Sequence, residues 1–345
     1  MKTFRLYGAR LLVALLLTLA AHNASGSSGS EAGATWTLRV PGFNDLNSVT
    51  YGNGLFVAVG GSYDSSTILT SRDGVSWTQR TSPTRDWLRG VTYGNGRFVA
   101  VGDGGTILTS RDGVSWTART SGTYNDLSSV TYGNGRFVAV GEDGTILTSR
   151  DGVSWTVRTS GTYNDLSSVT YGNDLFVAVG FGGTILTSRD GVNWTRRTLP
   201  TGNPLIGVTY GNGLFVAVGG LGTILTSQDG VSWTQRTSGT YNTLSSVTYG
   251  NGLFVAVGWP DTILTSQDGV IWTEQISPTR DWLNGVTYGN GRFVAVGYGG
   301  TILTSQDGVS WTARTSPTRD WLNGVAYGNG TFVAVGRYGT ILTSP

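Results

Sequence analysis

The chain has 345 residues, enough for two ordinary domains or for one large all-β domain, and its composition excludes several kinds of site. It contains no Cys, its only His is His22 and its only Lys is Lys2, so disulfides, thiol chemistry and metal sites with sulfur or nitrogen ligands are disfavoured. The 23 basic and 21 acidic residues nearly balance, which gives no electrostatic signal for nucleic acid or an anionic membrane.

The first residues have the layout of a secretory signal peptide. Lys2, Arg5 and Arg10 precede an apolar run at 11–21, and small residues follow it. The run is too short to span a bilayer. We therefore expect a cleaved signal peptide at 1–24, a Gly/Ser linker at 25–33 and one folded unit at 34–345. This predicts an exported protein, periplasmic or extracellular, without a stable membrane anchor.

A repeat of 39 residues fills the rest of the chain. One unit reads LSSVTYGNGRFVAVGEDGTILTSRDGVSWTVRT at 127–159, and it contains four short β-type segments separated by turn signals. We refer to these segments as strands A (SVTYG), B (FVAVG), C (TILTS) and D (SWTxR). Asn-Gly between A and B suits a type I′ hairpin, and the Asp between C and D can accept hydrogen bonds from the following backbone. Four strands at a period near 40 residues are typical of a propeller blade.

The two ends of the chain complement each other. Strands A and C each occur eight times, and the last strand C lies at 340–344. Strand D follows strand C only seven times, and the eighth copy is ATWTLR at 34–39. We therefore predict an all-β propeller of eight four-stranded blades in which the N-terminal strand completes the last blade; a seven-bladed ring is the alternative.

The segment SRDGVSW at 71–77 resembles the Asp box of the bacterial neuraminidase-type repeat, Ser-x-Asp-x-Gly-x-x-Trp. The resemblance covers 34–345, and the chain is similar to exported Asp-box propellers related to photosystem II assembly and stability factors. In that family the box is a structural turn, so the resemblance implies no catalytic residue. The seven copies have their Asp at Asp73, Asp112, Asp151, Asp190, Asp229, Asp268 and Asp307.

Candidate ligand-binding residues lie where the repeats differ. In an antiparallel blade the A–B and C–D turns share one face, and the B–C tips and D–A connections share the other. The first set is nearly invariant, whereas the second set varies and carries aromatic and charged residues on loops held by a rigid scaffold. The candidates are Trp87, Trp282 and Trp321 as stacking surfaces, Arg85, Arg280 and Arg319 as their polar partners, and Tyr124, Tyr163, Tyr241, Trp259 and Tyr298.

Several functions are compatible with such a face. We expect a multivalent carbohydrate-binding module, because aromatic rings beside polar groups suit sugars and repeated sites add avidity. A protein-interaction or assembly scaffold in the cell envelope is the alternative, and purely structural Trp side chains with a local Arg85–Asp86 ion pair are another. Ser-His, Cys-His and Schiff-base chemistry are disfavoured, because the chain beyond His22 lacks His, Cys and Lys. A degenerate sialidase-like glycosidase is disfavoured as well, because the chain has no Arg-Ile-Pro signature and its only glutamates are Glu31, Glu142 and Glu274. We expect a monomer with no cofactor, no metal site and no nucleic-acid partner.

Overall fold

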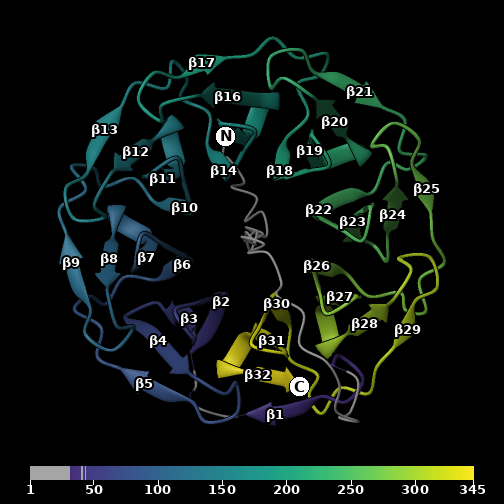
Figure 1. Ribbon diagram of the computed structural model, residues 1–345, viewed down its shortest axis with the longest axis horizontal. Helices are drawn as coiled ribbons and strands as arrows, with labels where there is room; N and C mark the ends of the chain where they lie inside the picture. The colour runs from purple at the N-terminus through teal and green to yellow at the C-terminus, as the bar shows by residue number, and fades with distance from the viewer. Residues whose placement is uncertain (1–31, 40–41, 43) are drawn as a thin grey trace, which may run out of the picture.

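A computed structural model describes residues 32–39, 42 and 44–345, and it confirms the eight-bladed propeller (Figure 1). Eight four-stranded antiparallel sheets surround a central axis, and each inner strand contacts the inner strands of both neighbouring blades. Blades are numbered 1 to 8 from the one that begins with β2. The expected signal peptide at 1–24 and residues 25–31 of the expected linker lie outside the described residues. In the described part, no helix has the length and apolarity needed to cross a bilayer.

The strands follow the order predicted from the repeat. The inner strands are β2 (Asp45–Gly52), β6 (Leu88–Gly94), β10 (Leu127–Gly133), β14 (Leu166–Gly172), β18 (Leu205–Gly211), β22 (Thr243–Gly250), β26 (Leu283–Gly289) and β30 (Leu322–Gly328). The second strands are β3 (Leu55–Ser62), β7 (Arg97–Gly102), β11 (Arg136–Gly141), β15 (Leu175–Gly180), β19 (Leu214–Gly219), β23 (Leu253–Trp259), β27 (Arg292–Gly297) and β31 (Thr331–Gly336).

The outer half of each blade is shorter. The third strands are β4 (Ser65–Ser71), β8 (Ile107–Ser110), β12 (Ile146–Ser149), β16 (Thr184–Ser188), β20 (Ile224–Ser227), β24 (Ile263–Ser266), β28 (Ile302–Ser305) and β32 (Ile341–Ser344). The outer strands are β5 (Thr78–Arg80), β9 (Thr117–Arg119), β13 (Thr156–Arg158), β17 (Thr195–Arg196), β21 (Thr234–Arg236), β25 (Thr273–Glu274), β29 (Thr312–Ala313) and β1 (Thr37–Arg39). Six tips between second and third strands form 3-10 turns: η1 (Asp103–Gly105), η2 (Glu142–Gly144), η3 (Phe181–Gly183), η4 (Gly220–Gly222), η5 (Tyr298–Gly300) and η6 (Arg337–Gly339).

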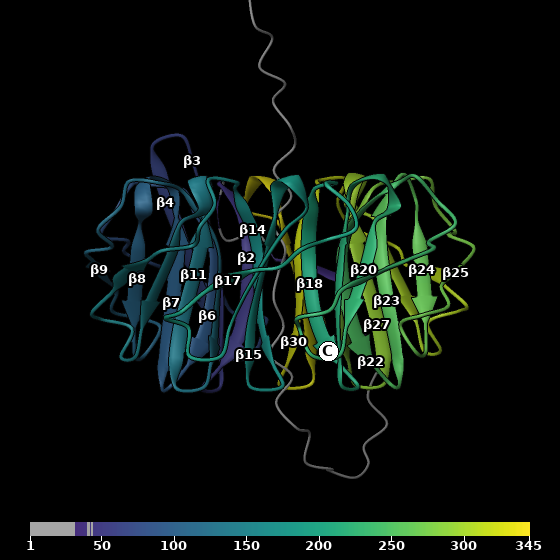
Figure 2. The same cartoon turned by 90° about the horizontal axis from the view of Figure 1, so that it is seen from above.

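The two faces of the ring differ in their turns (Figure 2). On the face that we call the box face, Asn53 and Gly54 both have positive φ values, 49° and 71°, as the predicted type I′ hairpin requires. The opposite face carries the variable tips and connections, and we call it the variable face. On it the β3–β4 hairpin reaches beyond the other tips, with Tyr63 99% exposed.

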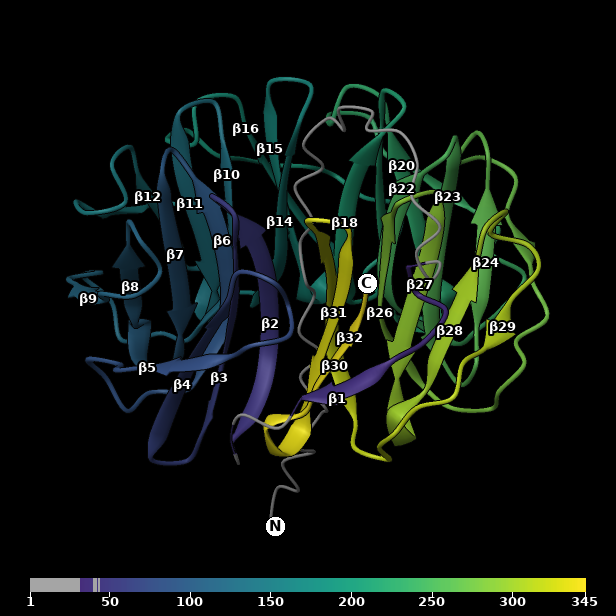
Figure 3. The ribbon, with the colours of Figure 1, turned by 60° about the horizontal axis from the view of Figure 1, so that its bottom comes forward.

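The N-terminal strand completes blade 8, as predicted (Figure 3). Strand β1 pairs antiparallel with β32, with Leu38 opposite Leu342. The folded unit begins earlier than expected, because Ala32 is buried and the N–H of Gly33 donates a hydrogen bond to Ser344 Oγ. These two residues therefore belong to the propeller and not to the expected linker.

The hydrophobic core lies between blades. One face of blade 3, with Phe137 and Leu147, packs against Val99 and Ile107 of blade 2, and the same cluster recurs at the other interfaces. The eight equivalent phenylalanines are fully buried. Burial of each such ring stabilises the fold by about 2–3 kcal/mol.

The recurring Tyr-Gly pair explains how neighbouring inner strands approach each other. A Cβ atom on Gly133 would lie 2.1 Å from Cγ of Tyr171 in the next blade, and the corresponding distance is 2.2 Å from Gly328 to Tyr51, where the ring closes. Each glycine therefore makes room for the tyrosine of the following blade.

The Asp residues of the repeat accept hydrogen bonds within the turns between third and outer strands. Asp151 Oδ1 accepts hydrogen bonds from Ser149 Oγ at 2.9 Å and from the N–H groups of Val153 and Ser154 at 2.8 and 2.9 Å. Trp155 Nε1 donates to the carbonyl of Gly152 at 3.0 Å. These carboxylates therefore shape turns on the box face, away from the variable face.

Candidate functional site

The variable tips and the connections between blades form one continuous layer. The N–H of Asp103, in the tip of blade 2, donates to the carbonyl of Trp87 in the connection that enters this blade, at 2.9 Å. The hydroxyl of Thr106 donates to Asp86 Oδ2 at 2.6 Å. Residues from both kinds of segment can therefore contribute to one surface.

Five side chains of this layer stack in a row, and we call them the aromatic arc: Trp259, Trp282, Tyr298, Trp321 and Arg337. Ring centroids are 5.0 Å apart for Trp259 and Trp282, and 6.2 Å apart for Trp282 and Tyr298. Tyr298 and Trp321 are 4.8 Å apart. Arg337 Cζ lies 3.6 Å from the ring centroid of Trp321, a cation–π contact. The arc spans blades 6, 7 and 8.

The backbone places these side chains side by side. Trp282 and Trp321 directly precede the inner strands β26 and β30, and their carbonyls accept hydrogen bonds from the N–H groups of Tyr298 and Arg337, both at 2.8 Å. Each Trp therefore lies beside the first tip residue of its own blade. Trp282 and Tyr298 are 38% and 42% exposed, so the arc is open to solvent.

The position of Trp282, directly before the inner strand, has another role in other blades. Asp126 and Asp165 stand where Trp282 stands, and each carboxylate accepts a hydrogen bond from the preceding tip, from Gly104 N–H at 2.9 Å and from Asp143 N–H at 3.0 Å. In those blades the position caps a turn. In blades 7 and 8 it instead presents an aromatic ring.

The predicted set of three tryptophans is not one cluster. Trp282 and Trp321 belong to the arc, 6.5 Å apart. Trp87 lies in blade 2 against the β3–β4 hairpin, 3.3 Å from the position of a Cβ on Gly61, and its Nε1 is buried without a hydrogen-bond partner in the described residues. Trp87 therefore contributes to a separate place on the face.

The three arginines predicted as polar partners of the tryptophans do not lie over the rings of the aromatic arc. Arg85, Arg280 and Arg319 are exposed, at the repeat position that holds Tyr124 in other blades. Among the described residues Arg85 makes no ion pair with Asp86, whose carboxylate instead accepts from the hydroxyls of Thr84 and Thr106, both at 2.6 Å.

Arg337, the cation that lies over Trp321, was not among the candidates from the sequence. It is the first residue of its tip, the position equivalent to Tyr298, and Tyr338 is the second. Leu221 is likewise the second residue of its tip, after Gly220. Aligning the tips on the glycine that directly precedes each of them, Gly219, Gly297 and Gly336, identifies the equivalent residues correctly.

Tyr124, Tyr163 and Tyr241 stand out from the rim of the variable face, 94%, 90% and 87% exposed. The neighbouring side chains are fixed, because Asn125 and Asn164 donate to Thr145 and Thr184 of their tips, each at 2.9 Å. The three tyrosines are therefore exposed aromatic groups beside side chains that are held by hydrogen bonds.

The far side of the variable face is charged. Arg89 of blade 2 donates to the carboxylate of Asp103 in its own tip and to Asp126 of blade 3, the latter at 3.0 Å. The Arg89 side chain is 12% exposed, so this is a half-enclosed ion pair between blades. No group of three or more potential metal ligands occurs in the described residues.

Fold and site define a class of protein, an eight-bladed β-propeller with an aromatic strip on one face. No protein-family model and no curated protein matches the sequence. Solved structures do match. YCF48 from Cyanidioschyzon merolae is 18% identical, with a TM-score of 0.60 over 78% of this chain and 99% of that chain.

Two further structures extend this comparison. YCF48 bound to D1 peptide is 20% identical over 76% of this chain and 92% of that chain, with a TM-score of 0.60. Virginiamycin B lyase from Staphylococcus aureus is 12% identical over 90% of this chain and all of that chain, with a TM-score of 0.61. At these identities the similarity establishes the fold, which is shared by peptide-bound and enzymatic propellers.

Proposed function

We propose that this chain is an exported, non-enzymatic scaffold whose variable face binds a polypeptide partner at the aromatic arc. The arc is the observation that carries the proposal, because four aromatic rings and one guanidinium group from three blades form a single partly exposed strip. Trp, Tyr and Arg are the side chains that most often dominate protein–protein binding.

The packing within the arc favours a polypeptide over a sugar. A sugar ring stacks on the open face of an aromatic side chain. Arg337 lies over the ring of Trp321, and Trp282 has Trp259 and Tyr298 on either side in tilted contacts, so neighbouring side chains restrict access to both indoles. The arc offers ring edges and a continuous apolar strip, which suit the side chains of an extended peptide. Carbohydrate binding, our first expectation from the sequence, is therefore the second candidate at this face.

The comparison with YCF48 supports the same choice by analogy of fold, since one of the similar structures holds a D1 peptide. Virginiamycin B lyase shows that the fold also supports catalysis. The non-enzymatic part of the proposal rests on residue types, because the chain beyond His22 has no His, Cys or Lys to serve as base, nucleophile or Schiff-base amine.

Export and the Asp-box assignment complete the proposal. Export to the periplasm or the extracellular space rests on the basic, apolar and small-residue order of residues 1–24. The Asp-box assignment is supported by the hydrogen bonds of the seven turns, in which Oδ1 of each Asp accepts from the two following N–H groups.

Peptide display on the purified protein tests the proposal. Random linear peptides are selected on the wild type, and the affinity of the selected peptides is then measured for Trp282→Thr/Trp321→Thr. Threonine is the residue that blade 6 has at this position, Thr243, so the variant should fold. We expect a loss of affinity of about tenfold or more, the size of a hot-spot effect.

A matched control and a glycan array make the result decisive. Tyr163→Ala removes an exposed aromatic group from the rim and should leave peptide affinity within about twofold. Selected peptides that bind the double variant as tightly as the wild type would contradict the site. Failure to select any peptide, together with glycan binding that the double variant loses, would replace the polypeptide partner by a carbohydrate.

A further inference from the structure

Two grooves run along the outer wall of the ring, one between blades 2 and 3 and one between blades 3 and 4. The first has a volume of 590 Å³ and is lined by Arg119 and Ser121 of blade 2 and by Trp155 and Val157 of blade 3. The second has a volume of 560 Å³, with Arg158 and Ser160 from blade 3 and Asn193, Trp194 and Arg196 from blade 4.

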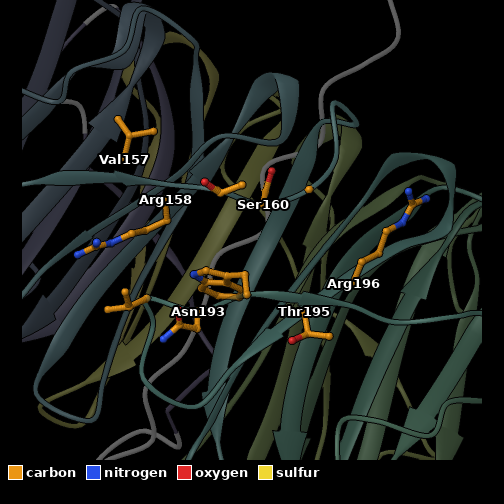
Figure 4. Close-up of a pocket in the computed structure, with 10 residues that line it drawn as sticks. Val157, Arg158, Ser160, Asn193, Thr195 and Arg196 are labelled. Carbon is orange, nitrogen blue, oxygen red and sulfur yellow. The ribbon is translucent and has the colours of Figure 1, made fainter.

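The same chemistry is present in both grooves. A half-buried Trp lies beside hydroxyl groups and an arginine, and Trp155 and Trp194 are more exposed than four equivalent tryptophans, which are 8% exposed: Trp116, Trp233, Trp272 and Trp311. Figure 4 shows Arg158 and Arg196 toward opposite ends of the second groove, with Ser160 and Asn193 between them.

Each groove adjoins a concentration of positive charge at the box face. Arg97, at the start of β7, is 9% exposed, and it lies against the Asp turn of blade 3, where a Cβ on Gly152 would be 2.7 Å from its Cδ. Burial lowers the pKa of Arg97, and the nearby Arg111 and Arg119 lower it further. Within residues 32–39, 42 and 44–345, no hydrogen bond or ion pair reaches its guanidinium group.

The next interface repeats this arrangement. Arg136 lies against the Asp turn of blade 4, with its Cδ 2.7 Å from the position of a Cβ on Gly191. Burial, Arg150 and Arg158 lower the pKa of Arg136 in the same way, and Asp190 opposes them. Three arginines therefore adjoin each groove, together with the Asp of the facing turn, Asp151 or Asp190, and the Asp that follows Arg111 or Arg150 in the chain.

Most other interfaces lack these arginines. The position of Arg97 is a leucine in four blades: Leu55, Leu175, Leu214 and Leu253. The position of Arg111 is a glutamine in blades 5, 6 and 7: Gln228, Gln267 and Gln306. The clustered arginines adjoin both grooves and are not required by the blade fold itself, because other blades fold with Leu or Gln at these positions.

We propose that these two grooves bind an acidic oligosaccharide, with one sugar ring on Trp155 or Trp194 and its carboxylate or sulfate groups on the adjoining arginines. Planar guanidinium groups bind such oxyanions through paired hydrogen bonds, and the half-exposed indole and the hydroxyls suit a sugar ring. Because the grooves lie one blade apart, one polymer chain can occupy both and gain avidity. This site is separate from the aromatic arc.

Calorimetric titration of the full-length protein tests the assignment. The probes are oligogalacturonate for carboxylates, sulfated chondroitin oligosaccharides for sulfates, a neutral dextran oligosaccharide, and poly-glutamate as a polyanion without sugar rings. We expect at least one acidic saccharide to bind at least tenfold more tightly than dextran and poly-glutamate.

The repeats supply matched variants. Arg97→Leu/Arg136→Leu installs the residue of four other blades and should lower the affinity for the acidic saccharide at least tenfold. Arg72→Gln changes the equivalent of Arg111 in blade 1, where Leu55 stands in place of Arg97 and which contributes to neither groove, and should change the affinity less than twofold. Trp282→Thr/Trp321→Thr should leave it unchanged, so failure here is distinct from failure at the arc.

Several outcomes would overturn the proposal. They are an absence of saccharide binding to the wild type, equal affinity for poly-glutamate at matched charge, and unchanged affinity in a folded Arg97→Leu/Arg136→Leu variant. Trp194→Phe provides a readout of stacking, because it should weaken saccharide binding while leaving any residual poly-glutamate binding unaltered. Equal loss for both probes would likewise contradict a sugar on the indole.

Discussion

The backbone N–H of Gly33 donates a 2.7 Å hydrogen bond to Oγ of Ser344, which lies 311 residues later in the chain. In blade 2 the equivalent bond joins Gly113 and Ser110 at 2.8 Å, within one turn. The eighth Asp turn is therefore divided between the two ends of the chain. It lacks its carboxylate, because Ala32 stands at the Asp position, and Trp36 still donates from Nε1 to the Gly33 carbonyl at 3.1 Å.

We predict that Trp36→Ala destabilises the whole ring. Trp36 is 6% exposed and its ring lies 6.4 Å from that of Phe332, so the change leaves a cavity at the closure and should cost about 3–5 kcal/mol. Urea unfolding followed by circular dichroism measures the effect. Thr37→Ala, at an exposed position of the same strand, should change stability by less than about 0.5 kcal/mol. Equal unfolding midpoints for the two variants would mean that the N-terminal strand does not close the ring.

Gly133→Ala should be strongly destabilising although it adds one methyl group. The new Cβ would lie 2.1 Å from Cγ of Tyr171, a partly buried ring that packs between two inner strands, so the strands must separate. A cost of about 1–3 kcal/mol or more is typical of such overpacking. Gly202→Ala is the control, because nothing lies within 4 Å of its Cβ position. Thermal melting compares the two, and a stable Gly133→Ala protein would contradict the close approach.

The repeat made most of the fold predictable, since each local signal recurs in every blade and the two incomplete ends fit together. Asn-Gly requires a hairpin turn at Asn53 as it does at Asn134, and the Asp of each box accepts from the two following N–H groups. Such features depend on a few adjacent residues. A single unit therefore contains the information needed for the blade, and the half-repeats at the ends contain the information needed for closure.

The arc was only partly predictable, because it depends on contacts between residues of different blades. The sequence marked Trp259, Trp282, Tyr298 and Trp321 as candidates but gave no reason why Trp87 should stand apart from them. That difference arises from the preceding tip, which is a Trp in blade 6 and Gly61 in blade 1. The grooves on the outer wall were missed because the positions of Arg97 and Arg111, although they differ between blades, lie outside the variable tips and connections from which the candidate residues were chosen.

Stability should fall with acidification through the Asp turns. The N–H groups of Ser232 and Val231 hold the pKa of Asp229 at about 2, below its ordinary value of 3.8, and the pKa values of Asp151 and Asp307 are lowered in the same way. A lowered pKa in the folded state stabilises the protein above pH 3.8, and this contribution is lost as the pH falls toward 2. Chemical unfolding at a series of pH values should therefore give a free energy of unfolding that decreases across this range.

Asp229→Ala isolates one of these carboxylates, and Ala32 shows that a blade accepts alanine at this position. At pH 7 the free energy of unfolding of the variant should be lower than that of the wild type by about 1 kcal/mol. The expected loss is small because the turn is exposed and solvent screens the charge of the carboxylate. The difference should shrink as the pH falls from 3.8 toward 2 and disappear below pH 2, where the wild-type carboxylate is fully protonated. A difference that stays constant with pH would assign the loss to packing and not to the charge.

Arg89→Ser tests the ion pair that links blades 2 and 3. Arg89 contacts the carboxylates of Asp103 and Asp126, and serine is the residue at this position in blade 3, Ser128. The change removes a cation between two acidic side chains that are 32% and 22% exposed, so we expect a loss of about 1–2 kcal/mol at low salt. The loss should shrink in 0.5 M NaCl because salt screens partly exposed charges.

A double-mutant cycle with Asp103→Gly completes this test, since glycine stands at the equivalent position of blade 5, Gly220. If Arg89 and Asp103 act as a pair, the double variant should be less destabilised than the sum of the single changes, by about 0.5–1 kcal/mol. Additive effects would mean that Arg89 acts through Asp126 or through packing alone. In that case Asp126, which pairs with Arg89 and accepts from Gly104 N–H, would be the carboxylate that links blades 2 and 3.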